Sequence, residues 1–241
     1  MLQSNVNEIM FPGKSLPNKG IDKVPIIDID GKYPALVINK RSSITILYFH
    51  GNRESICDVY ESYGTLKESA FNFVSPEYDG YSVRDGQETE RGCLEMAESA
   101  FRYSLTLGTG IIVIGYSIGS GPATHLCRYY PQDIFGLVLI NPFLSIKKLA
   151  FERVGIASIL VKQRFNNVKN IKEWNGNLIT ICGKNDNQIE FTHGVMLHAK
   201  CPSKYKKIII HEEEGHELSD WRELIFDPIF DVWFSNNKKT S

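Results

Sequence analysis

The sequence has little of several features that would place it in a specialised class of proteins. Its 27 Lys and Arg residues nearly balance its 28 Asp and Glu residues, which leaves a net charge of −1. This balance gives no electrostatic basis for binding nucleic acid. No apolar run approaches the roughly 20 residues that are needed to span a bilayer. We therefore expect no nucleic-acid partner and no transmembrane segment, while peripheral contact with a membrane stays open.

Targeting signals and cysteine frameworks are also lacking. The first residues show no basic segment followed by an apolar one, and residue 2 is leucine, so neither a secretory signal nor a myristoylation site is expected. The cysteines are odd in number and form no Cys-x-x-Cys pair: Cys57, Cys93, Cys127, Cys182 and Cys201. This pattern favours reduced thiols in a cytoplasmic protein over disulfides or a zinc site. We expect no metal and no cofactor.

What the sequence does contain is a regular alternation of apolar runs and amphipathic segments. The apolar runs predict eight strands, at residues 25–30, 33–39, 44–49, 71–74, 111–114, 134–140, 178–182 and 207–210. Helical periodicity predicts helices at 54–69, 88–106, 191–198 and 219–234. Strands that alternate with helices are typical of an α/β protein whose sheet is mostly parallel.

The length of 241 residues suits one α/β domain with a full core. We expect a single domain over residues 1–241, with an irregular lead-in at 1–24 and a polar tail at 235–241. Residues 141–174 mix short helical signals without a strand and predict a minimal lid or connecting region. The first two strands predict a hairpin that turns at Asp30-Gly31-Lys32.

The most informative stretch is Gly115-Tyr116-Ser117-Ile118-Gly119, which follows the buried strand at 111–114 and precedes a helix with Pro122 in its first turn. Strand, tight turn and helix form the context of a nucleophile elbow. Glycines on either side of the serine let the strand and helix approach closely. The N–H of Ile118 lies at the start of the helix, where it can stabilise an oxyanion. Ser117 is therefore the candidate nucleophile.

A serine nucleophile needs an imidazole and a carboxylate on loops at the same edge of the sheet. In this fold the chain order is Ser, then Asp or Glu, then His. His216 lies in the exit loop of the last strand, and Asp186 lies in the turn after the preceding strand. We predict a triad of Ser117, Asp186 and His216. His211 is the second choice for the base, and the alternative carboxylates are Glu190, Glu214 and Asp220.

A second loop at this edge is His50-Gly51-Asn52, directly after the strand at 44–49. Loops that leave the carboxyl ends of parallel strands build the sites of such proteins. Gly51 would allow the backbone to approach a ligand, and the Asn52 N–H is the candidate second oxyanion donor. We interpret His50 as a structural residue that shapes the turn, and not as the base.

These motifs resemble the α/β-hydrolase superfamily and, within it, the ABHD17-like (Bem46-related) serine hydrolases. The resemblance extends from about residue 44 to 220. It depends on His50-Gly51-Asn52, Tyr78-Asp79-Gly80-Tyr81, the Ser117 elbow, Asn141-Pro142-Phe143-Leu144-Ser145, Ile189-Glu190-Phe191-Thr192-His193-Gly194, Cys201-Pro202 and Gly215-His216. It implies an α/β-hydrolase fold with a small lid, the same triad, and an oxyanion hole from Asn52 and Ile118.

The resemblance also implies acyl hydrolysis, and in one branch the removal of palmitate from protein cysteines. Two departures affect that finer reading. Those depalmitoylases carry a lipidated, cysteine-rich N-terminal segment, whereas residues 1–40 here contain no cysteine. Ser82 also stands where the family usually has glycine. The sequence therefore predicts a serine hydrolase of acyl esters or thioesters, with a small-ester carboxylesterase or peptidase, or a non-catalytic binding protein, as alternatives.

Overall fold

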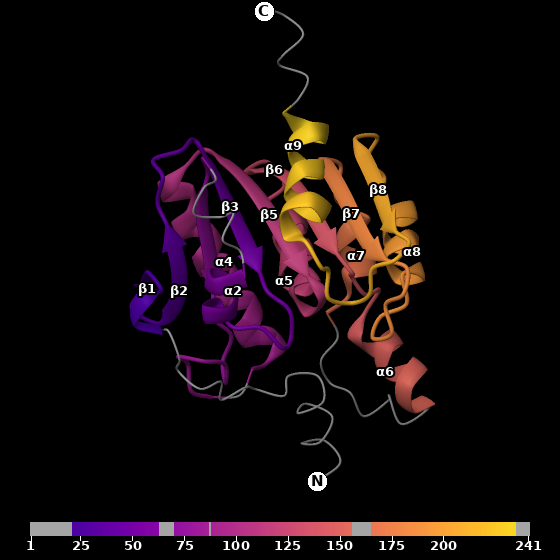
Figure 1. The fold of residues 1–241 in the computed structure, drawn as a ribbon, viewed down its shortest axis with the longest axis horizontal. Helices are drawn as coiled ribbons and strands as arrows, with labels where there is room; N and C mark the ends of the chain where they lie inside the picture. Colours follow the sequence, from indigo (N-terminus) through magenta and orange to yellow (C-terminus); the bar gives the residue numbers. More distant parts are fainter. Residues whose placement is uncertain (1–20, 63–69, 87, 156–164, 235–241) are drawn as a thin grey trace, which may run out of the picture.

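The architecture follows from a single sheet with helices on both of its faces (Figure 1). The structure is a computed structural model that describes residues 21–62, 70–86, 88–155 and 165–234. Its strands are β1 (Ile26–Ile29), β2 (Tyr33–Ile38), β3 (Ile44–Phe49), β4 (Asn72–Pro76), β5 (Gly110–Tyr116), β6 (Ile134–Ile140), β7 (Asn177–Gly183) and β8 (Lys206–His211). All eight predicted strands are present.

The strands form one eight-stranded sheet in the order β1-β2-β4-β3-β5-β6-β7-β8. β1 pairs with β2 and β2 pairs with β4 in the antiparallel sense, whereas all other neighbours are parallel. β4 runs two residues further than predicted, because Ser75 and Pro76 pair with β2. The predicted α/β class and hairpin are confirmed. Since β5 to β8 are parallel neighbours, the loops that follow them open at one edge of the sheet.

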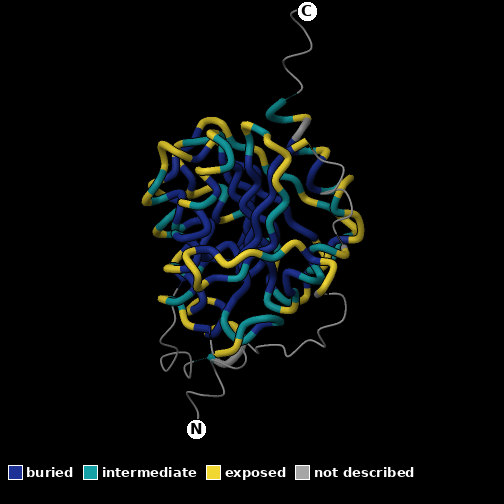
Figure 2. Tube along the Cα trace, turned by 90° about the vertical axis from the view of Figure 1, so that its left-hand side faces the viewer, coloured by how far each residue is buried: buried dark blue, intermediate teal, exposed yellow. Residues whose placement is uncertain are grey.

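Two apolar clusters fill the two faces of the sheet, because successive side chains of a strand point to opposite sides. Leu47, Phe49 and Val113 belong to one cluster, and Ile46 and Ile112 belong to the other. The central strands β3 to β7 are largely buried on both faces, which explains why they read as continuous apolar runs, whereas the edge strands β1 and β8 are partly exposed. Figure 2 shows this interior as a buried centre beneath exposed loops.

Helices complete each cluster. The first cluster takes residues from α4 (Glu90–Leu107), α5 (Ser120–Tyr129), α6 (Ile146–Val154), α7 (Asn167–Ile171) and α8 (Thr192–Lys200). The second takes residues from α2 (Ile56–Ser62), the π-helical turn η4 (Arg222–Phe226) and α9 (Asp227–Trp233). The predicted helix at 219–234 is thus π-helical in its first part. The N-cap of α4 is Thr89, whose side chain accepts the Gly92 N–H.

Several predicted segments fall partly outside the described residues. Of the lead-in at 1–24, the structure describes residues 21–24, with the short 3-10 helix η1 (Ile21–Lys23). Residues 63–69 of one predicted helix, residues 156–164 of the predicted lid and the tail at 235–241 also lie outside. Within the described part of 141–174, the structure has α6 and α7 and no strand.

Candidate active site

Ser117 occupies a strained turn between β5 and α5. Its φ is +53°, a region that side chains rarely adopt, and a 3-10 turn, η2 (Ser117–Gly119), leads into the helix. A Cβ on Gly115 would lie 2.5 Å from the Gly119 carbonyl oxygen, and one on Gly119 would lie 2.1 Å from the Phe49 carbonyl oxygen. The two glycines therefore allow a strand-to-helix turn too tight for any other residue, as the sequence predicted.

His216 lies between the serine and a carboxylate. Its Nε2 is 3.0 Å from Ser117 Oγ, and its Nδ1 is 2.7 Å from Asp186 Oδ2. Because a carboxylate only accepts, the Nδ1–H donates to Asp186, and Nε2 is left to accept the Ser117 hydroxyl proton. The Asp186 side chain is fully buried and that of His216 is 10% exposed. Residues 99 apart in the sequence thus form one hydrogen-bonded chain.

Asp186 has a second role in its own turn. Its Oδ1 accepts the N–H groups of Gln188 at 2.7 Å and Ile189 at 2.8 Å, which is an Asx-type turn. The turn fixes one carboxylate oxygen, so that the other, Oδ2, faces His216. The Asx turn is therefore compatible with the predicted contact between Asp186 and His216.

The alternative partners have other contacts. The ring Nε2 of His211 lies 3.3 Å from the Leu224 carbonyl oxygen. Glu190 accepts from the Thr192 hydroxyl, Glu214 accepts from the N–H and hydroxyl of Ser219, and Asp220 accepts the N–H groups of Arg222 and Glu223. These carboxylates order local turns, and the structure brings only Asp186 of the four candidates to His216.

His50 is fully buried, with Nε2 3.0 Å from Glu77 Oε1 and Nδ1 2.9 Å from the Gly51 carbonyl oxygen. Both ring nitrogens face acceptors, which fits an imidazolium. Burial alone would lower the pKa of His50, but the hydrogen bond and charge of Glu77 outweigh it and raise the pKa. His50 thus pairs with Glu77 in the protein interior, and sequence analysis did not identify Glu77. The one available signal was its place directly after β4.

Two tyrosine hydroxyls from the loop after β4 donate hydrogen bonds to the backbone of the His50–Asn52 loop. The Tyr81 hydroxyl donates to the Asn52 carbonyl oxygen at 3.0 Å and also contacts the Asn52 side-chain amide. The Tyr78 hydroxyl donates to the His50 carbonyl oxygen at 3.0 Å. Ser82, which replaces the usual glycine, has φ +40°, so the turn keeps a backbone conformation that favours glycine.

Gly51 lies in close contact with a neighbouring aromatic ring. An added Cβ would lie 2.7 Å from Tyr116 Cε1, so a larger residue would require that ring to shift. The approach of a ligand to Gly51 stays a prediction. The same tyrosine donates its hydroxyl to the His216 carbonyl oxygen at 2.9 Å. Burial raises the pKa of Tyr116 above its ordinary value, so the hydroxyl stays protonated and able to donate.

Known proteins match this chain in sequence and in fold. No protein-family model matches it. It is 28% identical over 183 residues to alpha/beta hydrolase domain-containing protein 17C of Xenopus tropicalis, an alignment that covers 73% of this chain and 56% of that protein. The chain therefore spans about half the length of the curated relatives it matches.

In structure, an alpha-beta hydrolase from Vibrio vulnificus superposes with a TM-score of 0.74 at 19% identity, covering 96% of this chain and 92% of that one. The chain has the α/β-hydrolase fold and is similar in sequence to ABHD17 proteins. An esterase from Exiguobacterium antarcticum has the same fold, with a TM-score of 0.64, 14% identity and coverage of 86% and 97%.

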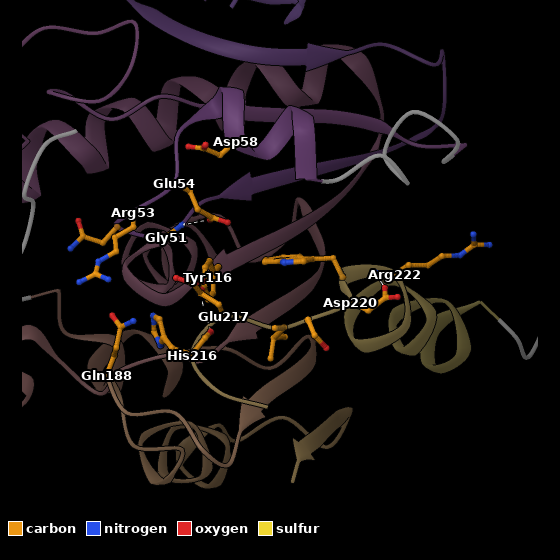
Figure 3. Close-up of a pocket in the computed structure, with 14 residues that line it drawn as sticks. Gly51, Arg53, Glu54, Asp58, Tyr116, Gln188, His216, Glu217, Asp220 and Arg222 are labelled. Carbon is orange, nitrogen blue, oxygen red and sulfur yellow. Dashed lines mark hydrogen bonds between the residues drawn. The ribbon is translucent and has the colours of Figure 1, made fainter. Parts of the chain in front are cut away.

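A cavity of about 580 Å³ adjoins His216 in this α/β-hydrolase (Figure 3). Its volume lies in the range of small-molecule sites. Segments 51–54 and 216–222 line most of it, together with Asp58, Tyr116 and Gln188. Figure 3 shows Tyr116 between the Gly51–Glu54 loop and His216, so the cavity opens beside the imidazole and the Asn52 loop.

Other features of this α/β-hydrolase bear on its chemistry and surroundings. In the described residues, no group of three His, Cys, Asp or Glu side chains is arranged to hold a metal ion. No helix in the described part of the chain is long and apolar enough to cross a membrane. All five cysteines are free thiols, and four of them are buried. Burial raises the pKa of the Cys182 thiol to about 12.

Proposed function

We propose that this α/β-hydrolase is a serine hydrolase that cleaves an acyl ester or thioester through Ser117, His216 and Asp186. The observation that carries the proposal is the position of His216, with Nε2 3.0 Å from Ser117 Oγ and Nδ1 2.7 Å from Asp186 Oδ2. Ser117 attacks the acyl carbonyl as His216 takes its proton. Asp186 orients the imidazole and stabilises the imidazolium that forms.

The tetrahedral oxyanion is held by the backbone N–H groups of Asn52 and Ile118. Loss of one such donor costs roughly 10²–10³ in kcat in a comparable site. When the intermediate collapses, His216 returns its proton to the leaving alcohol or thiol, and an acyl group stays on Ser117. Water then attacks the acyl-enzyme with His216 as base, and the carboxylic acid leaves. These steps need no metal and no cofactor.

The finer proposal is a thioester substrate, including an acylated cysteine of another protein. It follows from the resemblance to ABHD17-like hydrolases, and the matched esterase from Exiguobacterium antarcticum supports ester chemistry on this fold. The cavity adjoins His216 and Asn52 but is not lined by Ser117, so it offers space for the part of a substrate that lies beside the imidazole. The free thiols fit a reducing compartment such as the cytoplasm.

The test is hydrolysis of a chain-length series of p-nitrophenyl esters and matching acyl thioesters, by the wild type and Ser117→Ala, with fluorophosphonate labelling alongside. We expect the variant to lose both labelling and on the order of 10⁴-fold or more in kcat. Preference for long thioesters supports the acyl-thioesterase, and reaction with short esters alone supports a carboxylesterase. A wild type that neither labels nor reacts would make the chain a binding protein.

A further inference from the structure

Asn141 occupies a central position at the edge of the sheet where the site lies. It follows the last residue of β6, and β6 pairs with β5, which leads to Ser117, and with β7, which leads to Asp186. The residue is 3% exposed and has φ +44°. Asparagine is one of the few residues that adopts this conformation readily.

The Asn141 side chain links the loops of the proposed base and carboxylate. Its Nδ2 donates to the His216 carbonyl oxygen at 2.7 Å and to the Gly215 carbonyl oxygen at 3.3 Å. Its Oδ1 accepts the Gly183 N–H at 2.8 Å, three residues before Asp186. A single amide therefore fixes the distance between the two loops.

The surrounding packing leaves little freedom in this linkage. A Cβ on Gly183 would lie 2.1 Å from the Gly215 carbonyl oxygen, so the two loops are already in backbone contact. The His216 carbonyl oxygen also accepts from the Tyr116 hydroxyl. The backbone of the proposed base is thus fixed by donors from the residue that precedes Ser117 and from the end of β6.

We propose that Asn141 is a positioning residue, which holds the His216 backbone so that the imidazole lies between Ser117 and Asp186. This inference depends on the proposed function, because the proposed function assigns the role of general base to His216. An amide suits the position since it supplies donors to two carbonyls and an acceptor to one N–H. A carboxylate in its place would face the Gly215 and His216 carbonyls with no hydrogen to share.

The experiment is Asn141→Asp, which keeps the Oδ1 acceptor for Gly183 and side-chain size but removes the donors to the His216 loop. The matched control is Asn177→Asp, since Asn177 Nδ2 donates to the Phe135 carbonyl oxygen at 2.8 Å at the other end of β7. Active sites are counted by fluorophosphonate titration, and kcat and KM for p-nitrophenyl butyrate are expressed per titrated site.

We expect Asn141→Asp to lower kcat per titrated site by roughly 10²-fold, as a displacement of about 1 Å does to a catalytic group. KM should stay within about twofold, since Asn141→Asp changes no group that touches the substrate. Asn177→Asp should match the wild type, since Asn177 lies at the other end of β7. A merely structural role would reduce the number of titrated sites and leave kcat per site unchanged, which would overturn the inference.

Asn141→Ser keeps the test decisive where the aspartate variant fails to fold. A hydroxyl donates one hydrogen bond, so an intermediate loss of about tenfold in kcat per site is expected. Wild-type kcat per site in this variant would overturn the inference. A wild type that neither titrates nor turns over would instead refute the proposed function, and with it the role of Asn141.

Discussion

Gly119 lies so close to β3 that an added Cβ would be 2.1 Å from the Phe49 carbonyl oxygen. The neighbour is backbone of a buried strand and cannot rotate away. Gly119→Ala should therefore force apart β3 and the turn that carries Ser117. Overpacking of this kind costs about 1–3 kcal/mol, and we expect the upper end of that range in urea unfolding. The variant should also lose hydrolytic activity.

Gly110→Ala is the matched control for that substitution. A Cβ there would lie 3.6 Å from Ile44 Cγ1, an ordinary contact, on the same strand that leads to Ser117. Its free energy of unfolding should change by less than about 1 kcal/mol. Equal stability of the two variants would show that the close approach of Gly119 to the Phe49 carbonyl oxygen does not restrict the turn that carries Ser117.

Asp186→Asn should separate the two roles of the Asp186 side chain. The amide oxygen can still accept from Gln188 and Ile189, so the turn and the fold should persist. The amide no longer selects the Nδ1–H tautomer of His216, and in serine proteases that loss costs roughly 10⁴-fold in kcat. Ester hydrolysis per mole of folded protein measures the effect. The control Glu190→Gln should stay near wild type, and comparable losses in both variants would contradict the assignment of Asp186.

Tyr81→Phe should weaken the proposed oxyanion hole without touching the proposed triad. It removes the hydroxyl that holds the Asn52 carbonyl and amide, and it keeps the buried ring. If the Asn52 N–H then drifts from the oxyanion, kcat should fall by about 10-fold to 10²-fold, less than loss of the donor itself. Tyr205→Phe serves as control, because Tyr205 is 72% exposed. A wild-type kcat for Tyr81→Phe would mean that Asn52 is positioned by other contacts.

Glu88 should make stability depend on pH. It is 1% exposed, and although it accepts the N–H groups of Asp79 and Thr89, burial raises the pKa of its carboxyl from 4.5 to about 7. Between these values the unfolded chain releases a proton that the folded chain keeps. The carboxyl therefore costs stability progressively as the pH rises from about 4.5 to 7.

The measurement is urea unfolding of wild type and Glu88→Gln at pH 5 and pH 8. The stability of the variant relative to wild type should rise by on the order of 2 kcal/mol between the two pH values. Glu213→Gln, at an exposed position, should show no such change. If the free energies of unfolding of Glu88→Gln and wild type differed by the same amount at pH 5 and pH 8, the raised pKa of the buried carboxyl would be refuted.

The sequence was sufficient for the fold because the central strands β3 to β7 are largely buried on both faces and therefore read as uninterrupted apolar runs. The sequence also predicted that Ser117, Asp186 and His216 would lie together. Each of these residues follows a separate strand, and their order along the chain is the one expected of a nucleophile, a carboxylate and a base. The structure places the three side chains within hydrogen-bond distance. Their catalytic roles stay a prediction until the variants are measured.

Contacts between distant side chains could not be predicted in the same way. Glu77 meets His50 across 27 positions, and Asn141 meets His216 across 75. No periodicity encodes such pairs, because they depend on which loops the strand order brings together. The contact between Gly51 and Tyr116 could not be predicted for the same reason, since only the folded chain brings the two residues together.

The order of the strands also has a consequence for synthesis of the protein. β8 forms one end of the described sheet and follows every other strand in the chain, and its exit loop carries His216. A ribosome-bound chain that ends before β8 can build the elbow around Ser117 but lacks His216, the proposed base. Since domains assemble as the chain emerges at about 5–20 residues per second, nascent chains should resist fluorophosphonate until the last strand joins β7. Acquisition of reactivity would then report completion of folding during translation.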